Sequence, residues 1–280
     1  MKRSNPIQVW RWLLNSPASH HELISWNCRG LGNPRTVRDL CQMVKDKKPR
    51  FLFLMETKIK QHRLQHVRIK LGFEGLMAVD PVGLSGGIAL LWRDAREVEI
   101  QNFSLRHISA IITTEASVGP WRFTGFYGNP DHTKRDESWQ LLSHLRHYSP
   151  QSWLCVGDFN EIVDRSEKVG GAHRSERQME GFRKALAECQ LGDLGYRGSR
   201  FTWSNCREAA QFTKERLDRA TATRSWCEKF KYVEVMILAA RRSDHKPSGS
   251  LSVPNWLAED KDGVVLNMRL VGTLIRNVPL

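Results

Sequence analysis

The pattern of hydrophobic and polar positions predicts many short strands and a few helices. Short apolar runs bounded by turn residues are typical of buried strands. The clearest of these runs lie at residues 23–26, 51–55, 88–92, 108–112, 121–127, 153–156 and 233–238, with shorter ones at 201–203 and 214–218.

Apolar residues at helical spacing predict three helices. The first begins at Asn33-Pro34, an N-cap followed by proline in the first turn, and Lys45 to Arg50 end it with a basic turn. Its apolar residues recur at i, i+3, i+4 and i+7, so one face is buried. The second ends before Pro150, and the third covers residues 175–190. The apolar positions are Val37, Leu40, Cys41 and Val44 in the first helix, Trp139, Leu142 and Leu145 in the second, and Met179, Phe182, Leu186 and Cys189 in the third.

Many strands with few helices between them indicate an α+β fold, in which two packed β-sheets have helices outside. No boundary interrupts residues 22–247, so we expect one domain there. Residues 1–21 show no clear period and are predicted to be a poorly ordered extension. Residues 248–280 form an atypical C-terminal tail.

The net charge of +13 and the isoelectric point near 9.7 favour a polyanionic partner, DNA above all. Clustered Lys and Arg gain affinity by releasing counterions from phosphates. An anionic membrane surface would satisfy the same charge. However, the chain has no continuous basic amphipathic helix. No obligate protein partner is evident.

The six cysteines lie far apart, without the Cys and His spacing of a zinc site, and are expected to be reduced. The longest apolar runs are shorter than the roughly 20 residues of a membrane helix. The start of the chain lacks a secretory signal. The sequence therefore predicts a nuclear or cytoplasmic protein that is neither secreted nor transmembrane.

Polar residues follow three of the predicted strands. Asn27 ends the first, Glu56 follows the second, and Asp158 and Asn160 follow the run at 153–156 after the turn residue Gly157. In extended chain, residues i and i+2 point to the same side, so Asp158 and Asn160 can present their oxygens together. Such a pair can hold a hydrated cation or a water beside a phosphate. Turn hydrogen bonds alone are the alternative.

The ordered motifs WNCRG, METK, FYGNP, GDFN, RLDR and SDHKP resemble the endonuclease/exonuclease/phosphatase superfamily, which includes deoxyribonuclease I. The sequence segments WNCRGLGNPRT, GGIALLW, FTWSN and ERLDRA most resemble the endonuclease domain of plant non-LTR, LINE-type retrotransposons. The resemblance covers about residues 22–247. It implies a four-layer sandwich of two mixed sheets between helices, and phosphodiester cleavage that depends on Mg²⁺ or Mn²⁺.

The resemblance also implies residue roles. Glu56 resembles the principal metal ligand, with Asn27 and Asp244 beside the metal. Asp158 and Asn160 would orient the attacking water, and Tyr127 would donate to the phosphate. His245, with its ring fixed by Asp218, would act as acid or base; whether Asp158 or His245 takes the proton of the water stays open. Trp203 and Asn205 of FTWSN are candidate substrate-binding residues.

Several of these residues have a purely structural alternative. Tyr127 and Trp203 could be packing aromatics, His245 could belong to an exposed loop, and Asp218 could form a surface ion pair with the flanking Arg216 and Arg219.

The chain departs from the family pattern in two places. Abasic-site repair enzymes usually carry an acidic residue where this chain has Arg29, which weakens a repair function. SDHKP should lead into an apolar core strand, but residues 248–254 are flexible and poor in strand formers. We therefore predict a DNA-nicking endonuclease whose activity depends on the tail. A catalytically inactive nucleic-acid-binding remnant and a phosphatase on a small phosphoester are the alternatives.

Overall fold

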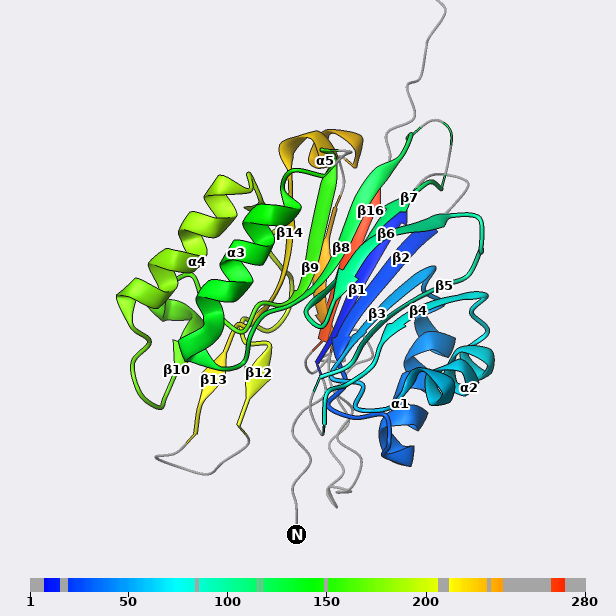
Figure 1. The fold of residues 1–280 in the computed structure, drawn as a ribbon, viewed down its shortest axis with the longest axis horizontal. Coiled ribbons are helices and arrows are strands. Elements are labelled where there is room, and N and C mark those ends of the chain that lie inside the picture. The colour runs from blue at the N-terminus through cyan, green and yellow to red at the C-terminus, as the bar shows by residue number, and fades with distance from the viewer. Residues whose placement is uncertain are drawn as a thin grey trace, which may run out of the picture.

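A computed structural model describes residues 8–15, 20–83, 86–114, 116, 118–148, 151–205, 212–230, 233–238 and 263–269. For residues 8–15, 20–22 and 263–269 only the backbone is described. Within these ranges the chain forms two large β-sheets with helices on their outer faces (Figure 1).

The first sheet has seven strands and is mixed. β2 and β3 are parallel neighbours, as are β1 and β16, and the remaining pairs are antiparallel. In spatial order the strands are β15 (Val235–Leu238), β16 (Gly263–Arg269), β1 (Gln8–Asn15), β2 (His20–Asn27), β3 (Phe51–Met55), β5 (Ile88–Trp92) and β4 (Gly75–Val79).

The second sheet has six strands, of which β8 and β9 are parallel neighbours. Its order is β11 (Gly192–Asp193), β14 (Asp218–Ala222), β9 (Trp153–Asp158), β8 (Trp121–Tyr127), β7 (His107–Ile112) and β6 (Val98–Ser104). A small third sheet contains β10 (Lys168–Val169), β13 (Lys214–Glu215) and β12 (Trp203–Ser204).

Helices cover the outer face of each large sheet (Figure 1). α1 and α2 lie on the first sheet, and α3 and α4 lie on the second. The helices are α1 (Pro34–Lys47), α2 (Gln61–Leu71), α3 (Arg135–Leu145), α4 (Glu176–Glu188) and α5 (Arg224–Lys229), with short 3₁₀ turns at His132–Lys134 and Arg165–Glu167. None of the helices in the described ranges is long and apolar enough to cross a membrane.

β3 is buried on both faces, and its sequence is therefore apolar at every position. Phe53 faces the second sheet, where its ring meets Phe123 edge-on at 6.0 Å between centroids. Leu52 and Leu54 face the opposite way and pack under α1 and α2. Gly125 lets the sheets approach, because a Cβ there would lie 2.3 Å from the Phe53 ring. Both faces are covered, so the predicted four-layer sandwich is confirmed.

The predicted central elements agree with the structure. β3 and β5 have the predicted bounds, and α1 begins where Asn33 caps it by accepting a hydrogen bond from the Arg35 amide at 2.9 Å. The run at 214–218 divides into β13 and β14, because the amides of Arg216 and Leu217 leave the sheet to bond Glu167 and Thr202.

The two ends of the chain differ from expectation. Residues 8–15, predicted to belong to a poorly ordered extension, form β1, which pairs along its full length with β2. Residues 263–269 of the tail form β16 between β15 and β1. The backbone donors and acceptors of β1 and β16 are therefore paired within the first sheet. The division at residues 22 and 247 stays a prediction.

Candidate active site at the edge shared by the two sheets

Strand direction brings polar residues from both sheets to one edge. The parallel strands β2 and β3 end together at Asn27 and Met55, and Glu56 follows. In the second sheet β8 and β9 also end together, with Tyr127 directly opposite Asp158. The antiparallel strand β14 begins there with Asp218, which is also opposite Asp158.

Asn27 joins the two sheets through its side-chain amide. Its Nδ2 donates to Glu56 Oε1 at 3.0 Å and to Asp158 Oδ2 at 2.9 Å. The Tyr127 hydroxyl donates to the same Glu56 oxygen at 3.2 Å. The Lys58 ammonium lies 3.0 Å from the other, Glu56 Oε2. Four of the residues that the sequence singled out are therefore in direct contact.

The oxygen atoms at this edge suit a hard divalent cation. The Oδ1 of Asn27 is buried and accepts no hydrogen bond from the described residues, although buried amide oxygens normally have a donor. It lies in the same amide group that contacts the Glu56 and Asp158 carboxylates. Within the described ranges, neither this site nor any other brings three His, Cys, Asp or Glu side chains close enough to hold a metal ion together. The available donors are thus two carboxylates and one amide, the oxygen ligands typical of Mg²⁺ sites.

The environment separates the acidities of the two carboxyl groups. Burial, together with the nearby charge of Glu56, raises the pKa of Asp158 to about 6. Hydrogen bonds from Asn27 and Asn160 act in the opposite direction, because they stabilise the ionised carboxylate. Burial also opposes ionisation of Glu56, but hydrogen bonds from Asn27 and Lys58 and the charge of Lys58 outweigh it and lower the pKa of Glu56. Glu56 is therefore the more readily ionised of the two.

Tyr127 is held as a neutral donor. Burial raises the pKa of its hydroxyl, and the Glu56 and Asp158 carboxylates raise it further. The Arg106 guanidinium lies 5.4 Å from the centre of its ring. Tyr127 therefore presents a protonated hydroxyl to Glu56 and is more than a packing aromatic.

The backbone at this edge is strained. Arg29, Glu56, Lys58 and Asn160 all have left-handed φ angles, between 50° and 55°. Non-glycine residues adopt this conformation rarely, and it persists where the surrounding structure enforces it. Left-handed conformations of this kind cluster at binding and catalytic sites.

Asn160 does not continue the strand in the extended form that the sequence suggested. Its left-handed backbone turns the chain, and its Nδ2 donates to the Gly128 carbonyl at 2.9 Å. The backbone N–H of Asn160 donates to Asp158 Oδ1 at 2.9 Å. Asn160 thus fixes the Asp158 carboxylate and ties the loop after β9 to the loop after β8.

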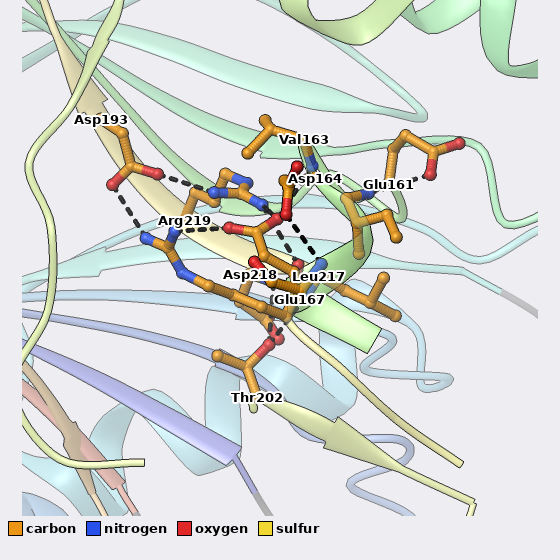
Figure 2. A network of polar contacts seen from close by, with 12 residues as sticks. Glu161, Val163, Asp164, Glu167, Asp193, Thr202, Leu217, Asp218 and Arg219 are labelled. Atoms are coloured by element: carbon orange, nitrogen blue, oxygen red, sulfur yellow. Dashed lines mark hydrogen bonds and ion pairs between the residues drawn. The ribbon is translucent and has the colours of Figure 1, made fainter. Parts of the chain in front are cut away.

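Asp218 is buried beside a network of charged groups (Figure 2). Thr202 Oγ1 accepts the amides of Leu217 and Asp218 at 2.9 and 3.0 Å. The flanking Arg216 and Arg219 do not form the suggested surface pair with Asp218, because their guanidinium groups bind Glu167 and Asp193.

The four charges of Arg216, Arg219, Glu167 and Asp193 close a ring. Arg216 lies 2.9 Å from Glu167 and 2.8 Å from Asp193. Arg219 binds the other carboxylate oxygen of both Glu167 and Asp193, and its Nη1 lies 2.7 Å from Asp193 Oδ2. Sequence reasoning missed Glu167 and Asp193. Two arginines flanking a buried aspartate were the available signal that carboxylate partners were required.

The remaining predicted residues have other contacts than the group around Asn27, or lie outside the described ranges. Trp203 is half-buried against Ile162, Met179 and Leu217, with the Arg29 guanidinium 5.9 Å from its ring centre. Asn205 closes the base of the β12–β13 hairpin by bonding Thr213. Asp244 and His245 lie outside the described residues.

Comparison with known proteins identifies the family. The model of the endonuclease/exonuclease/phosphatase family matches residues 24–245. The chain belongs to this family. Its fold agrees with the deoxyribonuclease I-like architecture that the motifs implied. No curated protein sequence matches the chain.

Several solved structures have a similar fold at low sequence identity to this chain. The endonuclease domain of TRAS1, a telomere-specific non-LTR retrotransposon, is 14% identical, with a TM-score of 0.55 over 86% of this chain and 96% of that one. The AP endonuclease LMAP from Leishmania major is 14% identical, with a TM-score of 0.60 over 78% and 83%. The 3′–5′ exonuclease NExo from Neisseria meningitidis is 19% identical, with a TM-score of 0.58 over 87% and 98%.

Proposed function

We propose that this protein is a metal-dependent phosphodiesterase that nicks DNA and derives from a retrotransposon. The observation that carries the proposal is the Asn27 amide, which joins Glu56 of one sheet to Asp158 of the other. The family is generally dependent on divalent metals. The net charge of +13 suits a polyanionic substrate. A related 3′ phosphatase from Neisseria was solved with a product DNA hairpin, at 19% identity and a TM-score of 0.53 over 75% of this chain.

Each residue has a role in this proposal. Glu56, the Asn27 amide oxygen and Asp244 would hold Mg²⁺ or Mn²⁺, which when bound supplies positive charge to the phosphate oxygens. Asp158, oriented by Asn160, would accept a proton from the attacking water, with His245 as the alternative acceptor. Tyr127 would donate to the phosphate, Asp218 would orient His245, and Trp203 and Asn205 would contact the substrate.

Nicking of supercoiled plasmid in Mg²⁺ tests the proposal. Replacing Glu56 or Asp158 by Ala is expected to reduce the rate by about 10²-fold or more, since each removes a charged group from the reacting centre. Glu188→Ala, on the exposed side of α4, is the matched control and should nick like the wild type. Equal rates for all four proteins would refute the assignment. Salt-sensitive DNA binding without nicking would indicate an inactive remnant, and preferential hydrolysis of a small phosphoester would indicate a phosphatase.

A further inference from the structure

A basic depression lies at the end of the first sheet opposite the candidate site. Its volume is about 580 Å³. Its position relative to the candidate site follows from β3, because Lys48 precedes this strand and Glu56 follows it. Arg93 follows β5, whose last residue pairs with the first residue of β3. The depression is therefore separated from Glu56 by the full length of β3.

The rim of the depression is entirely cationic. Lys45, Lys48, Lys70 and Arg93 line it, and no carboxylate does. The three lysines are exposed and form no ion pair with another described residue. α1 and α2 both end here, and a cation in the last turn stabilises a helix. Lys45 and Lys70 lie in these last turns, whereas Lys48 lies past the end of α1 and Arg93 follows β5, so the helix dipoles do not account for these two cations.

Arg93 is fixed in the wall. Its Nε donates to the Pro49 carbonyl at 2.8 Å and its Nη1 to the Gly72 carbonyl at 3.2 Å. The guanidinium lies 4.9 Å from the centre of the Phe73 ring. One cation of the rim is thus preorganised, which reduces the entropy lost when an anion binds.

The floor of the depression is apolar. Cys41, Val44 and Leu71 form it, and Val44 and Leu71 are buried members of the core under α1 and α2. An apolar floor inside a cationic rim matches a nucleotide unit, whose base has an apolar face and whose flanking phosphates are anionic. The volume lies within the range of small-ligand sites.

We propose that this depression binds single-stranded nucleic acid, with a base over Cys41, Val44 and Leu71 and the flanking phosphates on Lys45, Lys48, Lys70 and Arg93. This second site does not depend on the proposed nicking activity, because it needs neither Glu56 nor a metal. It would hold a single strand while the opposite edge of the sandwich contacts its own substrate.

Fluorescence anisotropy with labelled ten-residue oligothymidylate in EDTA tests the proposal. The Lys45→Glu/Lys70→Glu variant is expected to bind at least about tenfold more weakly, with a salt slope smaller by about 1.4, as for two lost phosphate contacts on a single strand. Lys184→Glu/Arg224→Glu changes the net charge equally on α4 and α5 and should lose clearly less. Equal losses in the two variants would reduce the effect to net charge and overturn the proposal.

Alkylation of Cys41, followed by peptide mass spectrometry, locates the bound strand. Oligothymidylate should slow the reaction of Cys41 with iodoacetamide several-fold and leave Cys227 unaffected. Unchanged Cys41 reactivity at saturating oligonucleotide would overturn the proposal. So would equal protection by inorganic phosphate alone, or protection by phosphatidylserine vesicles and not by the oligonucleotide. Both measurements work on a protein that does not nick DNA, so their failure is distinct from failure of the proposed function.

Discussion

At the scale of single residues, Asn27 connects the candidate site. The motifs named Asn27, Glu56, Asp158 and Tyr127 because their positions match a family pattern. The contacts among them could not be predicted, because the amide of Asn27 reaches both carboxylates only when the two sheets face each other. The role of Lys58 was missed for a local reason, because its contact with Glu56 depends on the left-handed backbone of both residues.

Asn27→Ala is expected to reduce plasmid nicking by about 10²–10³-fold, the usual cost of a lost polar group at a reacting centre. The variant leaves Glu56 and Asp158 facing each other without the shared donor. Asn33→Ala is the control, because Asn33 caps α1 and its loss costs about 1 kcal/mol of stability. Equal nicking by the two variants would exclude a role for Asn27 in the reaction.

The raised pKa of Asp158 predicts how stability depends on pH. The pKa of about 6 in the folded state exceeds the ordinary aspartate pKa of 3.8, so the folded state retains a proton that the unfolded state releases between these pH values. The stabilisation from the protonated carboxyl is complete below pH 4 and is lost as the pH rises through 6. Relative to wild type, Asp158→Asn should therefore gain about 2 kcal/mol between pH 4 and pH 8.

Urea unfolding in EDTA at pH 4, 6 and 8 measures this gain. The difference between the two proteins cancels the titration of groups that do not interact with Asp158, and its change with pH is independent of the constant effect of the altered hydrogen bonding. A difference that stays constant across this range would show that Asp158 titrates normally.

At the scale of elements, buried strands were predictable and peripheral ones were not. β3 and β5 are covered on both faces, so their sequences are apolar throughout. β8 is equally buried and carries four aromatic residues among its seven. α2 buries only Leu64, Val67 and Leu71, and β6 alternates between half-buried and exposed positions, so neither has a strong pattern. β10, β11, β12 and β13 have two residues each, too few for a period.

The charge ring fastens the start of β14 to the segment after β9 (Figure 2). Arg219→Met should destabilise the protein by about 3–5 kcal/mol, because it leaves buried Glu167 without one of its two cations. Arg224→Met removes an exposed pair with Glu228 and should cost under about 1 kcal/mol. Comparable urea midpoints for the two variants would mean that the ring contributes little.

The position before Asp158 requires glycine, although it lies within β9 and not in the turn that the sequence predicted. Gly157 has a φ of 146°, and a Cβ there would lie 1.9 Å from the Phe126 carbonyl oxygen. Gly157→Ala should therefore cost more than about 3 kcal/mol, since β8 and β9 must separate. Gly195→Ala meets open space and should cost about 1 kcal/mol for its φ of 72° alone. Urea unfolding of both variants compares the two costs, and equal losses would show that the close contact is relieved without separating the strands.

At the scale of the whole molecule, the first sheet is completed by strands from both ends of the chain. β16 lies between β1 and β15, far in sequence from both neighbours. The sequence predicted neither β1 nor β16, because residues 8–15 show no clear period and β16 depends on β1, which is distant in the chain.

A chain ending at residue 247 is expected to be less stable by about 2 kcal/mol or more, because it lacks β16, which pairs with six residues of β1. The control lacks only residues 270–280, which follow β16. Unfolding in urea compares the two with the full chain. An unchanged midpoint for the shorter chain would support the predicted boundary at residue 247.

The amide of Asn27 spans the space between the sheets, so the groups proposed to react meet only after both layers have closed on each other. A chain with one layer formed would hold every necessary side chain and still be inert. Catalytic turnover in dilute denaturant would then count the fully assembled molecules in a sample, and it would fall in step with the loss of contact between the layers.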